Sequence, residues 1–156
     1  MQIYQPFRIV LFGHRDFAYH NLIEKPLYTL LKEIISKKAF TEIYIGRNGE
    51  FDCYAAIIIK HLQNVIGKHN NELICVLPYP EKDMEYYEKY YDHVIIPEAI
   101  GRTYPKGALI KRNRWMVQQA DLFICYVERK EGGAYSALKY ARKLGKQIVN
   151  LAENNI

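Results

Sequence analysis

Short apolar runs alternate along the chain with longer stretches in which apolar residues recur every three or four positions. The runs are typical of strands covered on both faces, and they lie at residues 7–12, 42–45, 73–77, 94–96, 122–127 and 148–151. Helical periodicity marks residues 27–35, 55–66, 106–120 and 134–144. The alternation predicts an α/β fold, a Rossmann-like three-layer α/β/α domain with a mostly parallel sheet and helices on both faces.

Two residues are expected near the starts of helices. Pro26 suits the first turn of the first helix, because the N–H groups of a first turn have no partner within the helix. Asp52 can cap the second helix, since a carboxylate accepts hydrogen bonds from such free N–H groups.

A tyrosine-rich segment follows at residues 81–91. Tyr86 with Tyr90, and Tyr87 with Tyr91, are four positions apart, which predicts two adjacent stripes on a helix. These stripes favour packing against the sheet or against a second subunit of a homo-oligomer, with base stacking as the alternative.

Length and composition indicate one soluble unit. Residues 1–156 are expected to form a single domain, since domains typically hold roughly 100–200 residues. Hydrophobic residues make up 49% and charged residues 25%, as in globular proteins. No apolar run approaches the roughly 20 residues that cross a bilayer, and the first residues lack the build of a signal peptide. We therefore expect a cytoplasmic protein without a membrane partner.

The three cysteines suggest no special chemistry. Cys53, Cys75 and Cys125 lack CxxC spacing and paired histidines, so neither a metal site nor a disulfide framework is predicted. Cys75 and Cys125 stand inside apolar runs and are expected in the core.

Positive charge is concentrated in one segment. Residues 99–120 contain no Asp or Glu, and their five cations equal the whole net charge of +5: Arg102, Lys106, Lys111, Arg112 and Arg114. A local positive potential on a neutral body favours a discrete anion over a long polyanion, because duplex binding usually involves wider basic surfaces. From charge alone, a solvated basic helix face explains the segment equally well.

Polar residues follow four of the expected strands, at residues 13–15, 46–52, 78 and 131–133. In a parallel sheet the carboxyl ends of the strands share one edge, and ligands gather there beside the reversal of strand order. We therefore expect these turns to converge on one site.

The first turn is Gly13, His14 and Arg15. Glycine lets the backbone approach a ligand closely, while His14 and Arg15 can donate hydrogen bonds to a phosphate or a ribose hydroxyl. The same triplet also fits an ordinary turn with two exposed polar residues.

The second turn carries more charge than a connection needs. Gly46 and Gly49 permit a tight backbone path, and a capping role accounts for Asp52. Arg47 is a candidate for holding phosphate and Glu50 for accepting hydrogen bonds from ribose hydroxyls. A surface pair between Arg47 and Glu50 is the alternative.

The last turn and the basic helix complete the candidate site. Gly132 and Gly133 precede a helix whose free amides and positive end suit an anion, and Ser136 can add a hydroxyl. Asn113 lies on the apolar face of the basic helix, beside Arg112. Because buried amides and guanidinium groups need partners, both must meet either a structural network of carboxylates and strand-end carbonyls or a bound ligand.

Six motifs occur in an order that resembles a known family. They are FGHR, GEFD-x-x-A, LPY, KRNRWMV, AD-x-x-I and GGAYSALKYA, all between residues 7 and 151. Together they resemble the YpsA-like branch of the SLOG superfamily, whose Rossmann-type domains are related to the LOG and DNA-processing protein A domains. The resemblance implies one SLOG-like domain with a pocket for a nucleotide, NAD or an ADP-ribose-like ligand and no required cofactor. The pocket residues that it implies are Gly13, His14, Arg15, Gly46, Gly49, Glu50, Asp52, Arg112, Asn113, Gly132 and Gly133.

One departure from the LOG pattern concerns catalysis. The LOG motif PGG-x-GT-x-x-E aligns with residues 132–139, so Lys139 stands where that family has its catalytic glutamate. This argues against hydrolysis of nucleoside monophosphates by the LOG mechanism. Glu50 and Asp52 are the candidate carboxylates for another N-glycosidic cleavage.

Three functions follow from these observations. The first is binding or sensing of a phosphorylated nucleotide, with its charge held by the glycine turns and by Arg15, Arg47 and Arg112. The second is hydrolysis of an N-glycosidic or phosphate bond of a nucleotide. The third, given the least weight, is binding of single-stranded nucleic acid by the basic helix and the tyrosines. The sequence leaves open whether the protein is an enzyme.

Overall fold

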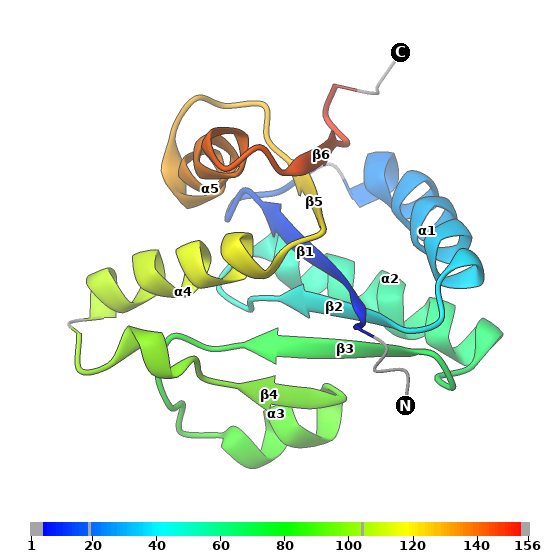
Figure 1. Cartoon of the computed structure of the whole chain (residues 1–156), viewed down its shortest axis with the longest axis horizontal. Helices are drawn as coiled ribbons and strands as arrows, with labels where there is room; N and C mark the ends of the chain where they lie inside the picture. The colour runs from blue at the N-terminus through cyan, green and yellow to red at the C-terminus, as the bar shows by residue number, and fades with distance from the viewer. Residues whose placement is uncertain (1–4, 19, 104, 154–156) are drawn as a thin grey trace.

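Six parallel strands form one sheet within the part of the chain that the computed structural model describes, residues 5–18, 20–103 and 105–153. The strands are β1 (Phe7–Gly13), β2 (Thr41–Ile45), β3 (Asn71–Val76), β4 (His93–Ile95), β5 (Leu122–Tyr126) and β6 (Gln147–Asn150). Their order across the sheet is β4-β3-β2-β1-β5-β6 (Figure 1). The predicted α/β fold is confirmed, and the sheet is parallel at every pairing rather than mostly parallel.

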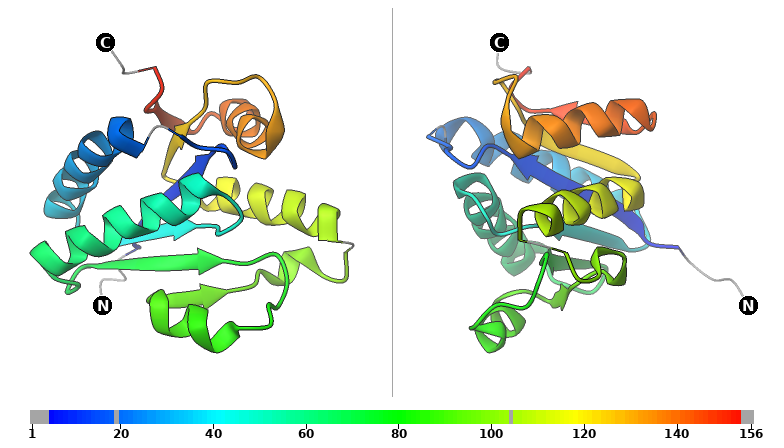
Figure 2. Two further views of the ribbon diagram at one scale, coloured as in Figure 1. Left: turned by 180° about the vertical axis from the view of Figure 1, so that it is seen from behind. Right: turned by 90° about the vertical axis from the view of Figure 1, so that its left-hand side faces the viewer.

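Helices cover both faces of the sheet (Figure 2). One face carries α1 (His20–Lys37), α2 (Glu50–Ile66) and α3 (Met84–Tyr90), while the other carries α4 (Pro105–Gln119) and α5 (Gly132–Lys143). The short 3-10 helix η1 (Glu98–Ile100) precedes α4. Alternation within β1 explains the two layers, because Ile9 and Leu11 join the core under α1 and α2 while Val10 and Phe12 join the core under α4 and α5.

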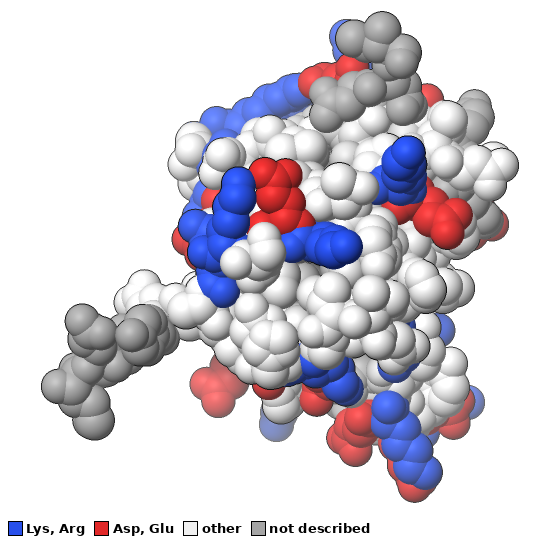
Figure 3. All heavy atoms as spheres, turned by 90° about the vertical axis from the view of Figure 1, so that its right-hand side faces the viewer, with Lys and Arg blue, Asp and Glu red and all other residues white. Residues whose placement is uncertain are grey.

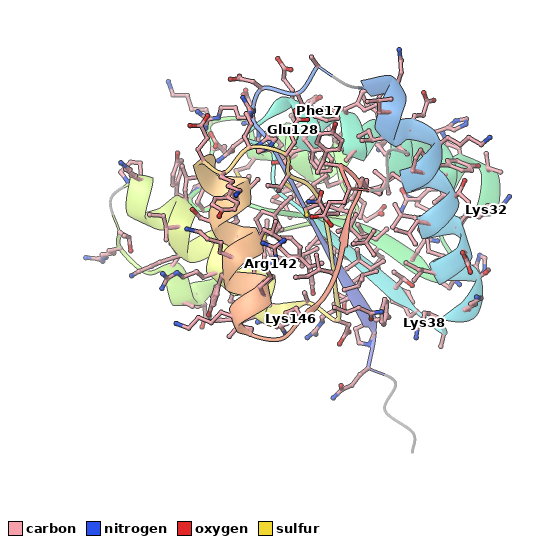
Figure 4. The ribbon with its side chains drawn as sticks, turned by 90° about the horizontal axis from the view of Figure 1, so that it is seen from above. Phe17, Lys32, Lys38, Glu128, Arg142 and Lys146 are labelled. Atoms are coloured by element: carbon pink, nitrogen blue, oxygen red, sulfur yellow. The ribbon has the colours of Figure 1, made fainter. Side chains whose placement is uncertain are left out.

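The order of the strands reverses between β1 and β5. Strands β1 to β4 extend in one direction from this point, and β5 and β6 extend in the other. The chain leaves β1 for α1 on one face and leaves β5 for α5 on the opposite face. Figure 4 shows Phe17 and Glu128, from the two loops that follow these strands, at the same end of the sheet. A crevice between such diverging loops is where open α/β sheets bind ligands.

Pro26 and Asp52 occupy positions in their helices that differ from the expected ones. Helix α1 begins at His20, so Pro26 lies inside it rather than in its first turn. The side chain of Ile23 is 0% exposed and continues the buried stripe of Leu27 and Leu31. Burial of this stripe therefore stabilises helix on the N-terminal side of Pro26, although proline has no N–H group to donate within the helix. Helix α2 begins at Glu50 with Gly49 as its N-cap, and Asp52 lies within the first turn.

The tyrosine stripes are confirmed. Within α3 and just after it, the rings of Tyr86 and Tyr90 stack with centroids 6.1 Å apart, and those of Tyr87 and Tyr91 are 6.5 Å apart. Tyr87 and Tyr91 are buried in the core beneath α1 and α2, so this pair packs against the sheet.

Two further expectations concern burial and membranes. Cys75 and Cys125 are buried, as predicted, and Cys53 is exposed. None of the described helices combines the length and the apolar character that a membrane span requires.

Candidate functional site

A cavity of about 590 Å³ lies between α4 and α5 at the carboxyl edge of the sheet. Its walls are the end of β1, the loop between β2 and α2, and the facing sides of α4 and α5. We call this cavity the pocket. It lies beside the reversal of strand order between β1 and β5, the position at which this kind of sheet binds ligands.

A charge pair forms part of the pocket wall, with a buried guanidinium and a partly buried carboxyl group. Arg112 is 5% exposed, and its guanidinium donates to the main-chain oxygen of Val76 at 2.8 Å and to Oδ1 of Asn113 at 2.8 Å. The carboxyl group of Asp52 lies beside it, since a Cβ at Gly46 would be 3.0 Å from both Arg112 Nη1 and Asp52 Oδ2. Glycine at position 46 therefore leaves room for both charged groups at the carboxyl end of β2.

The partners of Arg112 and Asn113 match one branch of the sequence prediction. Arg112 donates to a strand-end carbonyl and to the neighbouring amide, and it interacts electrostatically with the carboxyl group of Asp52, which is the structural network that was expected as an alternative to ligand contact. Both residues also line the pocket, so the network presents its surface to a ligand.

Burial changes the acidity of Asp52. Desolvation raises the pKa of this carboxyl group to about 6, while the charge of Arg112 and a hydrogen bond from the main chain of Asn48 partly oppose the rise. Desolvation also lowers the pKa of Arg112 from its usual range, although Asp52 counteracts it. The charge of the pocket therefore changes between mildly acidic and neutral pH.

The pocket has a basic rim and an apolar wall. Arg15, Lys106 and Arg114 line it with exposed side chains, and the Arg114 guanidinium lies 5.4 Å from the centroid of the Tyr140 ring. The apolar wall comes from α4 and α5 and consists of Leu109, Ile110, Met116, Val117, Ala134 and Ala137. A ligand that carries both an anion and a flat apolar group suits this arrangement.

Another face of the molecule carries charges of both signs. Figure 3 shows the face on which α1 lies in Figure 1, and there Lys and Arg side chains stand next to Asp and Glu side chains. The five cations of residues 99–120 equal the whole net charge of +5, so the basic excess of the sequence lies in α4 and just before it.

The start of α5 forms one end of the pocket. Gly133 and Ser136 line it, and a Cβ at Gly133 would lie 3.7 Å from Nδ2 of Asn113, an ordinary contact distance. Gly132 has a φ of +88°, a conformation that favours glycine, which accounts for a glycine at the start of α5 without a ligand. Lys139 does not line the pocket, and its ammonium group lies 4.8 Å from the centroid of the Tyr135 ring.

His14 occupies a different position from the one predicted. It is 5% exposed, and its Nε2 accepts hydrogen bonds from the main-chain N–H groups of Glu128 at 3.0 Å and Arg129 at 3.2 Å. Desolvation, and then the charge of Arg129, lower its pKa, so the ring is neutral. His14 thus fastens the turn after β1 to the loop after β5.

Arg47 and Glu50 have folding roles that the sequence did not predict. The Glu50 carboxylate accepts a hydrogen bond from the main-chain N–H of Phe17 at 3.1 Å. Arg47 lies over the ring of Tyr87, 4.6 Å from its centroid, and approaches Glu81 at 3.9 Å. These contacts take the place of the surface pair between Arg47 and Glu50 that was given as the alternative.

The predicted site residues divide into two groups. Those that the structure brings together around the pocket are Gly13, Arg15, Gly46, Gly49, Asp52, Arg112, Asn113, Gly133 and Ser136. Among the described residues, those that lie outside its wall are His14, Arg47, Glu50 and Gly132.

Sequence reasoning missed several pocket residues. Lys106, Ile110 and Val117 precede or follow Asn113 by three, four or seven positions, and Tyr140 follows Gly133 by seven. Residues at these spacings share a helix face, so extending the stripe from Asn113 and Gly133 would have found them. Within the described ranges, no group of three His, Cys, Asp or Glu side chains is placed to hold a metal ion.

Comparison with solved structures supports the fold. DNA processing protein A from Streptococcus pneumoniae matches with a TM-score of 0.68 and 16% identity, over 92% of this chain and 49% of that one. The chain shares the fold of the matched part of this protein. DNA processing protein A from Helicobacter pylori, whose structure is described as showing a single-stranded DNA binding mode, matches with a TM-score of 0.62 and 18% identity over 92% of this chain and 64% of that one.

These comparisons cover part of the larger proteins. The chain spans about half of the first matched protein and somewhat under two thirds of the second. No protein-family model and no curated protein sequence matches the chain. The similarity therefore establishes the architecture, while the YpsA-like branch stays a prediction.

Proposed function

We propose that the protein binds single-stranded nucleic acid and holds one nucleotide unit in the pocket between α4 and α5. The observation that carries the proposal is the combination of a basic rim with an apolar wall in one cavity at the carboxyl edge of the sheet. The rim suits a phosphate and the wall suits an unstacked base.

Several groups that line the pocket can donate hydrogen bonds to a phosphate. Arg15 and Lys106 contribute charge at the rim, and Gly133 belongs to the first turn of α5, where main-chain N–H groups lack partners within the helix. Binding by such a site requires no base pairing. A base within a duplex would have to leave its stack to enter the pocket, so a single strand is the favoured substrate class.

The fold similarity adds support by analogy. The Helicobacter pylori protein of the same fold is described by its single-stranded DNA binding mode, at 18% identity. Function does not follow from fold, so this analogy supports the proposal of single-strand binding but assigns no residues to it.

A free nucleotide or a nucleotide-derived metabolite is the second candidate. The specific observation that favours it is the cavity volume of about 590 Å³, which is within the usual range of roughly 300–1,000 Å³ for small-molecule sites. NAD and ADP-ribose-like molecules carry the same phosphate and base groups. In this case the protein would bind or sense the ligand in solution.

Hydrolysis of a nucleotide remains a third proposal. Asp52 is its candidate carboxylate, because it lines the pocket, whereas Glu50 is hydrogen-bonded to the main chain of Phe17. The bond that would break is the one between the sugar and the base, with water supplying the new hydroxyl group and the proton of the released base.

The decisive experiment compares two lysines of α4. Lys106 lines the pocket and Lys111 is exposed elsewhere on the same helix, where it donates to Oγ1 of Thr103 at 3.1 Å. Affinity for a labelled single-stranded oligonucleotide should fall about tenfold in Lys106→Ala and by much less in Lys111→Ala, since loss of one charge-assisted contact costs roughly 1.5–3 kcal/mol. Fluorescence anisotropy across a range of salt concentrations measures both.

The outcomes separate the candidates. Oligonucleotide binding that depends on Lys106 supports the main proposal. Binding of free nucleotides alone, with the same dependence on Lys106, supports the second candidate. Release of free base from either ligand, abolished in Asp52→Asn, supports hydrolysis, and equal losses in both lysine variants contradict a role for the pocket.

A further inference from the structure

A second hollow adjoins the pocket. It has a volume of about 510 Å³ and lies against the start of α2 and the turn after β1. Three residues line both hollows, and they form the ridge between them: Arg15, Asn48 and Gly49. We call this feature the ridge.

The ridge is fixed by the fold. Arg15 Nε donates to the main-chain oxygen of Asn48 at 3.0 Å, and the main-chain N–H of Glu50 donates to the oxygen of Arg15 at 2.9 Å. The two backbones approach so closely that a Cβ at Gly49 would lie 2.7 Å from the Cα of Arg15. A ligand that crosses the ridge therefore meets a preorganised surface.

The terminal nitrogens of Arg15 can donate hydrogen bonds to a ligand on the ridge. Among the described residues, no hydrogen bond or ion pair engages its terminal nitrogens, while Nε holds Asn48. The side chain is exposed to solvent and borders both hollows. A phosphate lying on the ridge would meet this guanidinium, whose fork geometry matches phosphate oxygens.

The second hollow itself has no net charge. Arg15 and Arg47 are balanced there by Asp16 and Glu50. Arg47 already interacts with Glu81 and with the ring of Tyr87. Because its charges balance, the second hollow exerts little electrostatic attraction on a second phosphate.

The apolar part of the hollow comes from α2. Tyr54 and Ile57 line it, and the side chain of Ile57 is 57% exposed. An aromatic ring and an exposed aliphatic side chain beside polar groups offer a surface for a flat, uncharged group with hydrogen-bonding edges. A nucleobase is such a group, and bases bind single-strand proteins largely through their faces.

We propose that the second hollow holds the base of the nucleotide next to the one in the pocket, with the phosphodiester between them bound on the ridge by Arg15. This inference rests on the proposed function and makes it more specific, because it names a ligand of at least two linked nucleotides. A free mononucleotide would fill the pocket and leave the second hollow unused.

Two residues of α2 provide a matched test. Ile57 lines the second hollow, and Val65 lies outside it on the same helix with nearly the same exposure, 58% against 57%. They are eight positions apart, or about 12 Å along a helix, beyond the Debye length of about 8 Å at physiological salt. Ile57→Asp and Val65→Asp add the same charge, so their difference reports on the hollow.

The ligands are deoxyadenosine 5′-phosphate and the dinucleotide and trinucleotide built from it, measured by calorimetry. We expect the dinucleotide to bind the unchanged protein at least about tenfold more tightly than the mononucleotide, since stacking of one base contributes roughly 1–3 kcal/mol. Ile57→Asp should remove this gain and leave mononucleotide affinity unchanged, and Val65→Asp should affect neither. Thermal unfolding of both variants checks that each is folded.

Other results overturn the inference in distinguishable ways. If the dinucleotide gains nothing, or if Ile57→Asp leaves its gain intact while Lys106→Ala still weakens binding, the second hollow is not a subsite and the pocket proposal stands. A change of oligomeric state in Ile57→Asp with unchanged dinucleotide affinity assigns the surface to a second copy of the chain instead. If mononucleotide, dinucleotide and longer strands all fail to bind, both proposals fall.

Discussion

Arg15 Nε donates a hydrogen bond to the main-chain oxygen of Asn48 at 3.0 Å, and this bond joins the turn after β1 to the turn after β2. The two residues are 33 positions apart in the chain. Their contact fixes a guanidinium between two hollows before any ligand arrives. Little conformational freedom is then lost when an anion binds, which favours affinity.

Replacement of Arg15 tests this position directly. We expect Arg15→Ala to weaken binding of a single-stranded oligonucleotide about tenfold, because one charge-assisted contact to phosphate is lost. The slope of log affinity against log salt should also fall by about 0.7, the value for one phosphate contact on a single strand. Arg102→Ala is the control, since Arg102 is exposed and lies outside the residues that line the pocket. Similar losses in both variants would indicate only a general effect of net charge.

Gly49 and Gly133 should respond differently to a methyl group. A Cβ at Gly49 would lie 2.7 Å from the Cα of Arg15, so Gly49→Ala forces two backbone segments apart and should lower the free energy of unfolding by about 1–3 kcal/mol. At Gly133 the nearest atom would be 3.7 Å away, so Gly133→Ala should leave stability nearly unchanged. Chemical denaturation of both variants measures the difference. Equal stability in the two would mean that the ridge can relax.

The fold could be predicted because its signals are local. Apolar runs and helical stripes each span a few residues, and their alternation was enough to specify a parallel sheet with helices on both faces. The need of Arg112 for a carboxylate or a strand-end carbonyl was also predictable, since a buried guanidinium must be satisfied wherever it lies. The structure supplies both, in Asp52 and in the oxygen of Val76.

The roles of His14 and Glu50 could not be predicted in the same way. Glu50 accepts from Phe17, 33 positions away, and His14 accepts from Glu128, 114 positions away. Which acceptor meets which N–H group depends on how the loops close over the edge of the sheet, and no periodicity in the sequence encodes that. Polar residues beside glycine at a strand end therefore served loop closure as well as the pocket.

His14 should contribute to stability in a pH-dependent way. Its Nε2 accepts from two main-chain N–H groups, so His14→Ala should lower the free energy of unfolding by about 1–3 kcal/mol at neutral pH. The folded state lowers the pKa of this ring below its ordinary value of 6.5, so the unfolded chain binds the proton more readily. The contribution is therefore fully present above about pH 6.5 and is lost as pH falls below it. Denaturation at several pH values should show a shallower slope in His14→Ala than in His69→Ala, a control at an exposed histidine.

Asp52 should make nucleic-acid binding depend on pH. Burial raises the pKa of its carboxyl group to about 6, and Arg112 is the nearby cation that opposes this rise. Above that pH a negative charge at the pocket wall repels phosphate, and below it the repulsion disappears. We expect affinity for a single-stranded oligothymidylate without terminal phosphate to rise roughly fivefold from about pH 7.5 to about pH 5.5, equivalent to about 1 kcal/mol of charge repulsion. The diester groups and thymine do not titrate in this range, so the change reports on the protein.

The Asp52→Asn variant isolates this effect, because an amide cannot ionise. Its affinity should vary little between about pH 7.5 and about pH 5.5 and should resemble that of the unchanged protein at the acidic end.

The raised pKa of Asp52 also predicts how the stability of the protein depends on pH. A carboxyl group whose pKa rises from 3.8 to about 6 on folding holds its proton more tightly in the folded state, so it contributes stability that is complete below about pH 4 and is lost as pH rises through 6. Unfolding free energies of the unchanged protein and of Asp52→Asn should therefore diverge across that interval in favour of the variant. If binding is pH-dependent but the stabilities do not diverge, a group other than Asp52 controls the pocket.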